Sequence, residues 1–426
     1  MKKILFVLLI GSFLSATAQI ETPGKKQTQK ILLLNGIAHL GNGKIIQNSA
    51  IAFEDGKLTI VANAAAIKID FSQYDTVINI ATKHVYPGII TPNSTLGLTE
   101  IGAVRMTHDY AEWGVYKPHV RAIIAYNTES KITTTIRSNG VLMGQITPRH
   151  GAISGSSSIV QFDAWNWEDA VYREDDGVHL NWAKMFNKWT GKKNKDYDIS
   201  ITGLTSFFAN ALAYSKKQNY LEKNLRFEAM RGIFNGEKTL YIHADFVKEI
   251  TEAINFSKKH KVSKMVIVGG YDAWMVADML KENKVSVILK RVHSLPERQD
   301  DAVNLPFKLP KMLHDAGVLC CLENSGDMEA MGTRNLPFYA GTAAAFGLDK
   351  EVALSLITLN TAKILGIDKT CGSLEVGKDA TLFISKGDAL DMRTNNLKAA
   401  FIQGRLLDID NHQEKLYRKY SKKYEK

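Results

Sequence analysis

The sequence predicts an α/β fold in which a parallel barrel lies between two hairpin-rich ends. Residues 31–80 form short apolar runs broken by turn residues, a pattern typical of a small antiparallel sheet. From about residue 89, apolar strands alternate with helical stretches, and after Gly366 the hairpin pattern returns. Repeated strand–helix units of this size favour a parallel barrel, and the C-terminal ends of its strands carry the active site.

Turn residues predict the N-terminal hairpins. The apolar run 31–34 is followed by Asn35-Gly36, and the run 51–53 leads into Asp55-Gly56. Such dipeptides between apolar runs are the strongest short-range signal for a tight hairpin. We therefore expect a turn at both places. Further strands of the same sheet are expected over 58–62 and 76–80.

The barrel strands are predicted from apolar runs of four or five residues. They are residues 142–146, 239–243, 265–268, 285–289 and 318–322. Amphipathic periodicity predicts helices over 247–260, 273–283 and 309–316. Residues 182–231 are rich in Lys and Asn and then helical, so we expect an insertion over the barrel mouth. Residues 151–158 are rich in Gly and Ser, and turn geometry would explain these glycines.

The first 18 residues have the pattern of a signal peptide. Lys2 and Lys3 precede an apolar stretch over 4–14, and Ala16-Thr17-Ala18 provides small residues for cleavage. We therefore expect a mature chain that begins at Gln19 and is periplasmic or secreted. No later window is apolar enough to predict a membrane span.

Composition indicates an ordinary globular protein, with 45% hydrophobic and 23% charged residues among 426. Cys320 and Cys321 are adjacent within an apolar run, so they are predicted to be core residues rather than a disulfide. The net charge is +10, and part of the excess lies in residues 413–426. Because no aromatic-interleaved basic motif is present, we expect a solvated tail helix and no nucleic-acid partner.

Three motifs resemble one known family. Residues 87–96, Pro-Gly-Ile-Ile-Thr-Pro-Asn-Ser-Thr-Leu, have the frame of the pattern Pro-Gly-apolar-apolar-Asp-x-His-x-His-Leu. Residues 358–366 and 372–384, which include Gly-Ser-Leu-Glu-Val-Gly-Lys-Asp-Ala, are similar to a closing signature of the same family. This family is the amidohydrolase superfamily, in its imidazolonepropionase-like branch. Residues 334–341 also resemble that branch, and the resemblance covers essentially the whole mature chain.

The resemblance implies a (β/α)8 TIM-like barrel with a small composite β-sandwich domain built from both chain ends. In that family the chain leaves the barrel and adds strands to the sheet begun at the N-terminus. The expected divisions are a signal peptide over 1–18, the first part of the sandwich over 19–88, the barrel over 89–366, and the second part with the basic tail over 367–426.

The resemblance also implies metal-dependent hydrolysis of C–N bonds. Family members hold one or two divalent metals through His-x-His on strand 1, a lysine or glutamate on strand 4, histidines on strands 5 and 6, and an aspartate on strand 8. In this chain Asn93 and Thr95 stand at the two strand-1 positions. Amide and hydroxyl oxygens are weak zinc ligands, so the implied site is altered or degenerate.

The remaining ligand positions are only partly filled. His243 follows Tyr-Ile and precedes Ala-Asp, which matches the strand-5 pattern, whereas strand 6 runs into Gly-Gly-Tyr271 without a histidine. Ser325 stands at the strand-8 aspartate position, with Asp327 two residues beyond it and Glu323 two before. Asp327 is the candidate proton shuttle, and its alternative role is to cap a short helix.

Other residues could complete a relocated site. His293 follows a predicted strand, and His150 follows another, so a metal held by His243, His293 and His150 is one hypothesis. The expected cofactor is then one divalent metal, zinc or similar. Arg149, Tyr271 and Ser325 are predicted to line the pocket.

Two functions remain open from the sequence. The first is an exported hydrolase that acts on a C–N bond of a small amide-like substrate. The second is a catalytically silent barrel of the same fold, which binds a small ligand or a partner; the missing strand-1 and strand-6 histidines favour it.

Overall fold

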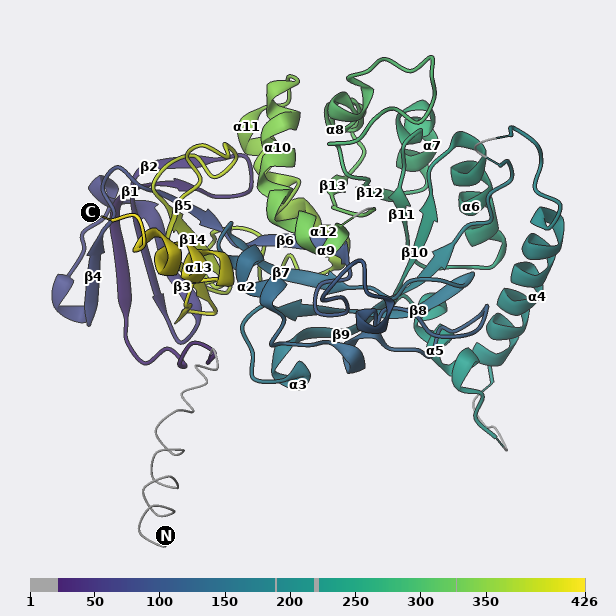
Figure 1. The fold of residues 1–426 in the computed structure, drawn as a ribbon, viewed down its shortest axis with the longest axis horizontal. Helices are drawn as coiled ribbons and strands as arrows, with labels where there is room; N and C mark the ends of the chain where they lie inside the picture. Colours follow the sequence, from purple (N-terminus) through teal and green to yellow (C-terminus); the bar gives the residue numbers. More distant parts are fainter. Residues whose placement is uncertain (1–21, 188–189, 218–221, 327, 426) are drawn as a thin grey trace, which may run out of the picture.

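A computed structural model describes residues 22–187, 190–217, 222–326 and 328–425. The predicted signal peptide and Asp327 lie outside these ranges. The chain forms two eight-stranded sheets, one mostly of N- and C-terminal strands and one of central strands (Figure 1). Helices cover the outer side of the central sheet.

The central sheet is a nearly closed barrel, which confirms the predicted fold class. Its strands follow one another in chain order: β6 (Ile89–Ser94), β7 (Val141–Ile146), β8 (Ile153–Gln161), β9 (Val171–Asn181), β10 (Thr239–Ala244), β11 (Met265–Gly269), β12 (Ser286–Leu289) and β13 (Cys320–Leu322). All neighbouring pairs are parallel except those of β8, which runs antiparallel to both β7 and β9. The parallel strands therefore bring their C-terminal ends to one rim.

A short segment closes the barrel between its first and last strands. The main-chain N–H of Leu322 donates to Leu356 O at 3.1 Å, and that of Ile90 donates to Ile357 O at 3.0 Å. Residues 356–357 thus lie between β13 and β6 and bond to both. The seam is held by the chain between two helices rather than by direct strand pairing.

The Gly/Ser-rich segment forms strand β8 and not the turn or loop that its composition suggested. Residues 153–161 are almost entirely buried, and the Ser157 hydroxyl donates to the Asp176 carboxylate on β9 at 2.8 Å. The inward face of this strand carries small polar side chains that bond to its neighbour. A hydrophobic pattern is consequently absent, and this is why the sequence suggested a loop.

The helices follow the βα pattern. They are α2 (Lys131–Arg137), α3 (Trp167–Ala170), α4 (Tyr197–Ser215), α5 (Leu225–Asn235), α6 (Val247–Lys259), α7 (Ala277–Glu282), α8 (Leu305–Asp315), α9 (Glu329–Gly332), α10 (Leu336–Ala345), α11 (Lys350–Ser355), α12 (Leu359–Leu365) and α13 (His412–Ser421). Both α4 and α5 fall in the segment expected as an insertion. Because α5 contacts β9 and β10, it belongs to the crossover between these strands. No helix in the described ranges is long and apolar enough to cross a bilayer.

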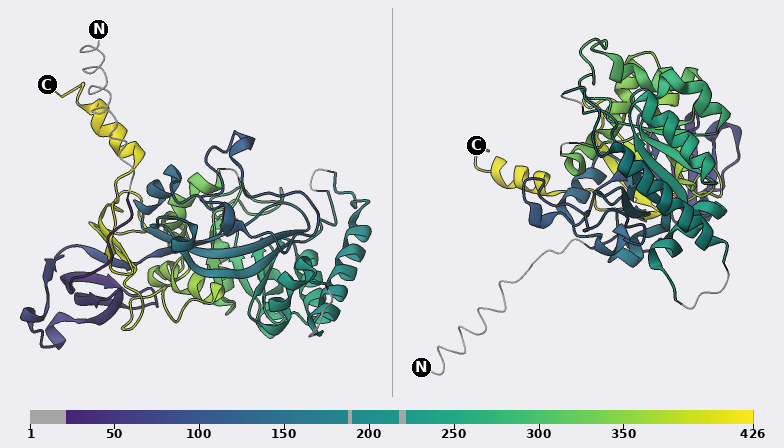
Figure 2. Two further views of the ribbon diagram at one scale, coloured as in Figure 1. Left: turned by 90° about the horizontal axis from the view of Figure 1, so that it is seen from below. Right: turned by 90° about the vertical axis from the view of Figure 1, so that its right-hand side faces the viewer.

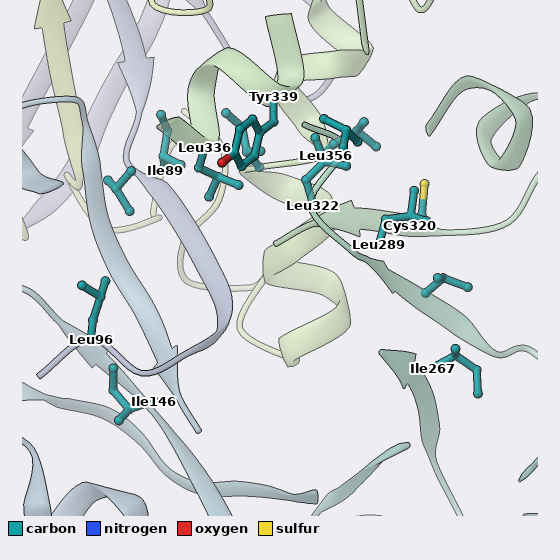
Figure 3. Packing of buried hydrophobic residues seen from close by; sticks show 14 of the residues in the cluster. Ile89, Leu96, Ile146, Ile267, Leu289, Cys320, Leu322, Leu336, Tyr339 and Leu356 are labelled. Atoms are coloured by element: carbon teal, nitrogen blue, oxygen red, sulfur yellow. The ribbon is translucent and has the colours of Figure 1, made fainter. Parts of the chain in front are cut away.

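Two apolar layers hold the barrel. Outward side chains of the strands, such as Ile89, Ile267 and Leu322, pack with helix residues such as Leu336 and Tyr339 (Figure 3). At the end of the barrel opposite the rim, the inward side chains of the strands pack against α12. These inward residues include Ile90, Met143, Ile159, Tyr241, Val268, Ile288 and Cys321. The interior at the N-terminal ends of the strands is therefore filled by apolar side chains.

The second sheet joins both ends of the chain, as predicted. Its strands are β1 (Ile31–His39), β2 (Ile45–Glu54), β3 (Lys57–Asn63), β4 (Thr76–Asn79), β5 (His84–Pro87), β14 (Leu382–Ser385), β15 (Leu397–Ile402) and β16 (Arg405–Leu406). Strand β14 pairs antiparallel with β5, which places residues about 300 positions apart side by side. One residue, Gly88, links this sheet to the barrel, and a Cβ there would lie 2.7 Å from the Thr381 side chain.

One predicted hairpin turn is confirmed and the other is wrong. Asp55 and Gly56 both have positive φ, 48° and 76°, and connect β2 to β3 as a type I′ turn requires. Asn35, with φ of 69°, instead lies within β1 where the register shifts, so the chain continues through a bulge. A positive φ satisfies either conformation, and the sequence does not distinguish them.

Candidate functional site

A cavity of about 1080 Å³ lies at the rim of the barrel, above the ends of β6, β7 and β9. Thr95, Arg149 and Asn181 line it from the barrel side. The opposite wall is largely apolar and comes from the loop after β6 and from the segment before and within α9. Its apolar members include Ile101, Ala103, Met328, Ala330 and Met331, and Ile132 of α2 also lines the cavity. The cavity thus combines a polar floor with an apolar wall, as small-molecule sites commonly do.

Asn93, which the sequence motif predicted at the first strand-1 ligand position, has each of its polar groups hydrogen-bonded within the protein. Its main-chain N–H donates to Gln145 Oε1 at 3.0 Å, and its side-chain amide donates to the Glu323 carboxylate. Its side-chain and main-chain oxygens both accept from Arg149, at 3.0 and 2.8 Å. Asn93 has a φ of 49°, and the β6–β7 register shifts there. Asparagine tolerates this left-handed conformation better than most residues.

Arg149 ties the cavity wall to the barrel. Besides its two bonds to Asn93, Nη2 donates to Glu329 Oε1 at 2.5 Å. Glu329 begins α9 and also lines the cavity. The guanidinium therefore lies between β6 and the open cavity, and it carries a permanent positive charge.

Glu323 is a candidate functional residue that the sequence analysis did not include among the predicted site residues. It follows β13 directly, is only 1% exposed, and accepts from the Ser325 hydroxyl at 2.5 Å as well as from Asn93. Burial raises the pKa of Glu323 to about 7, although its bonds to Ser325 and Asn93 and the charge of Arg149 act in the opposite direction. Its position immediately after the last apolar strand was the signal that could have found it.

A second polar layer lies beneath Asn93. Gln145 donates to Asp176 Oδ2 at 2.7 Å, and the Tyr241 hydroxyl donates to the same oxygen at 2.9 Å. Burial raises the pKa of Asp176, while its hydrogen bonds to Ser157, Gln145 and Tyr241 lower it. These groups support Asn93 from below through Gln145. Asp176 and Gln145 lie in a region that the sequence assigned no site role.

His243 is paired with another histidine rather than with a ligand set. On the neighbouring strand, His179 places Nδ1 3.0 Å from His243 Nε2, and its ring stacks on Tyr241 at 4.7 Å. Burial lowers the pKa of His243 to about 3, and the charges of Arg149 and Lys184 act in the same direction. Both rings are consequently neutral near pH 7, since the pKa of His179 is also well below its usual value.

The other predicted site residues are spread over different places. His150 stacks on Tyr110 at 5.8 Å and lines the cavity with Arg149. His293 lies apart, where its Nε2 is 2.6 Å from Thr342 Oγ1 and its ring packs on Tyr339. The Tyr271 hydroxyl donates to Asp301 at 2.7 Å. Asp327 is not among the described residues. The structure therefore does not bring His243, His293 and His150 to one point.

The residues at the rim do not fit the metal plan implied by the family resemblance. Within the part of the chain that the structure describes, no group of three or more His, Cys, Asp or Glu side chains could hold a metal ion. The side-chain oxygen of Asn93 already accepts from a guanidinium, and that charge also acts on His179, His243 and Glu323. A divalent cation at the end of β6 would lie beside the positive charge of Arg149, and Coulomb repulsion opposes this.

The raised pKa of Glu323 predicts a pH-dependent effect on stability. The folded chain keeps this proton up to about pH 7, whereas an unfolded carboxyl loses it near 4.5. The stability from the protonated form is thus fully present below about 4.5 and lost as the pH rises through 7. Glu323→Gln stays neutral, so we expect it to stabilise the fold at pH 8 by up to about 3 kcal/mol.

Urea unfolding of both proteins at pH 4.5 and pH 8 would measure this effect. The advantage of the glutamine variant should be small at the lower pH and appear only at the higher one. An equal change at both values would mean that packing, not ionisation, separates the two proteins.

A model of the Amidohydrolase family matches residues 221–407. The structure of an amidohydrolase from Thermotoga maritima MSB8 is similar with a TM-score of 0.78 at 21% identity, over 89% of this chain and 100% of that one. No curated protein sequence matched the chain.

Two further solved structures share the fold at lower similarity. One is a Xaa-Pro dipeptidase with bound methionine, with a TM-score of 0.54 at 13% identity over 89% of this chain and 100% of that one. The other is a zinc-bound adenosine deaminase from Xanthomonas campestris, with a TM-score of 0.55 at 13% identity over 92% and 98%. The family is typically metal-dependent. The family model thus matches part of the chain, and the barrel with its composite sheet is similar to the fold of the solved amidohydrolase.

Proposed function

We propose that this protein hydrolyses a C–N bond in a small amide-like substrate, and that Arg149 and Glu323 act where relatives use a metal. The observation that carries the proposal is the buried Glu323 carboxyl, with a pKa of about 7, joined through Asn93 to an arginine at the cavity. A general base is most effective when its pKa lies near the working pH. The match to the Amidohydrolase family model supports hydrolase or deaminase chemistry.

The proposed steps use the chain's own groups. Ionised Glu323 accepts a proton from a water molecule by way of the Ser325 hydroxyl, while the water oxygen bonds to the substrate carbonyl carbon. The carbonyl oxygen takes the place of Glu329 at Arg149 Nη2, where the guanidinium stabilises the developing negative charge. The C–N bond then breaks, the proton passes to the leaving nitrogen, and a carboxylic acid and an amine are released.

A hydrolysis screen tests this proposal. Chelator-treated protein is incubated with a panel of N-acyl amino acids, dipeptides, ureas and cyclic imides, and the released amine or acid is measured. We expect turnover of at least one class, unchanged when zinc, manganese or cobalt is added. Turnover that appears only after metal addition would contradict the roles given to Arg149 and Glu323.

A second candidate is the silent barrel that binds a ligand without turnover. Its support is the saturation of the rim, because Asn93 has each polar group bonded and Glu323 accepts at both oxygens. Under this alternative, a compound from the same panel raises the melting temperature without being consumed. Arg149→Met should then abolish the thermal shift, whereas Glu323→Gln should preserve it.

We also propose that the protein is exported, on the basis of the N-terminal sequence alone. Expression of the full chain in a bacterial host, followed by osmotic release of the periplasm, should yield a protein that begins at Gln19. Intact-mass spectrometry measures the cleavage site. A cytoplasmic protein that retains Lys2 and Lys3 would contradict export.

A further inference from the structure

The last helix, α13, stands away from the body of the protein. Figure 2 shows it in both views as a helix that projects past the sheet and barrel. All ten of its residues are described, and none is buried. It contacts the body at its first turn, where the Thr135 hydroxyl of α2 donates to Gln413 Oε1 at 2.8 Å.

The exposed face of α13 is apolar and aromatic. Leu416, Tyr417, Tyr420 and Tyr424 are 37%, 70%, 57% and 77% exposed. At about 100° per residue they fall within an arc of about 100° around the helix axis. The helical turn continues beyond Ser421, since the N–H of Tyr424 donates to Ser421 O at 2.8 Å. The three rings therefore lie along one side.

Much of the rest of the α13 circumference is basic, and Lys419 and Lys423 lie next to the aromatic arc. Arg418, Lys419, Lys422 and Lys423 are exposed and fall outside the aromatic arc on the same helical projection. Arg418 pairs with Asp410 at 2.5 Å, whereas Lys419 and Lys423 approach the rings of Tyr420 and Tyr424. The acidic residues are Glu414 and Glu425, so positive charge prevails.

An exposed aromatic face is unusual for a helix that contacts only solvent. A short helix that packs on nothing is marginally stable, and packing of an apolar face normally supplies most of its stability. Polar contacts support α13, among them an N-terminal cap in which the Asn411 side chain accepts from the Glu414 N–H at 3.0 Å. An aromatic stripe beside a basic arc is the pattern of helices that lie in a membrane interface.

We propose that α13 and the turn that follows it dock on an anionic lipid surface. The tyrosine rings enter the headgroup region, where their apolar faces and polar hydroxyls are both accommodated, and the lysines contact lipid phosphates. The first turn remains fixed to α2, so the body is held at the surface. This inference is independent of the proposed hydrolysis and departs from the solvated tail expected from sequence.

Vesicle sedimentation of the full chain tests the docking. We expect binding to vesicles that contain phosphatidylglycerol, little binding to phosphatidylcholine alone, and weaker binding as salt increases. Lys419, Lys422 and Lys423→Gln together should weaken binding about a hundredfold, because each basic residue near the surface contributes about fivefold. Replacement of Tyr417, Tyr420 and Tyr424 by Ala should abolish vesicle binding without a change in melting temperature.

A matched control separates the helix from general surface charge. Lys258, Lys259 and Lys261 are exposed at the end of α6, and their replacement by Gln removes the same charge. This variant should bind vesicles as the wild type does. Equal loss in both lysine variants would overturn the inference.

Two other results would also overturn it. A concentration-dependent dimer in vesicle-free ultracentrifugation, lost in the tyrosine variant, would assign the aromatic face to a second copy. Binding to DNA that matches binding to the anionic vesicles and ignores the tyrosine changes would assign the basic arc to polyanions in general.

Discussion

Glu323→Gln should lower the rate of hydrolysis about 10²- to 10⁴-fold, the range expected for loss of a positioned general base. Glutamine keeps the size of the buried side chain but cannot accept a proton. The pKa of about 7 adds a second expectation, since the wild-type rate should fall as the pH drops below about 7. Measurement of kcat/KM from pH 5 to 9 on the best substrate of the screen checks both.

The control for this change is another buried carboxyl. Glu351 on α11 lies 2.7 Å from His39 of β1, between the barrel and the composite sheet. Glu351→Gln should leave the pH profile in place even if it alters stability. If Glu323→Gln retained full activity with an unchanged profile, proton transfer would belong to another group.

Arg149→Met should reduce kcat/KM about 10²- to 10³-fold, because it removes both the donor and the charge aimed at the substrate oxygen. The charge of Arg149 also lowers the pKa of Glu323, so the acidic limb of the pH profile should move to higher pH. That shift is a readout that a merely structural role would not give. Arg149→Lys should recover part of the rate, since it keeps the charge but not the planar fork.

Arg405→Met provides a matched arginine deletion. Arg405 donates to Gln161 and Asp163 at the edge of the composite sheet, away from the cavity. Its loss should not move the pH profile. An Arg149→Met protein that loses activity without any shift of the Glu323 limb would contradict electrostatic coupling between the two residues.

The parts of the fold predicted well are those in which one pattern has one outcome. The predicted strand 239–243 and helix 247–260 correspond to β10 and α6 within one residue. Their hydrophobic periodicities reflect burial on fixed faces. The bulge at Asn35 and the polar strand β8 were missed because a turn dipeptide and a Ser-rich run each permit more than one structure.

The candidate site could be predicted from the sequence only in part. The strand-1 frame identified Asn93 as a special position, but Arg149 is 56 residues further along and Glu323 is 230 residues away. Sequence spacing does not report which side chains meet across a barrel. The family's ligands are histidines, and the sequence prediction therefore rested on them, whereas the polar contacts at this rim centre on an amide, a guanidinium and a carboxyl.

The pairing of β5 with β14 has a consequence for the order in which the protein is made. Residues 84–87 emerge early during synthesis, whereas their partners at 382–385 appear only when the chain is almost complete. Until then, β5 presents unsatisfied main-chain groups on that side, a surface that invites pairing with other chains. Assembly of this sheet must therefore be a late event after translation, and ribosome-bound chains that stop short of residue 385 should require protection from aggregation.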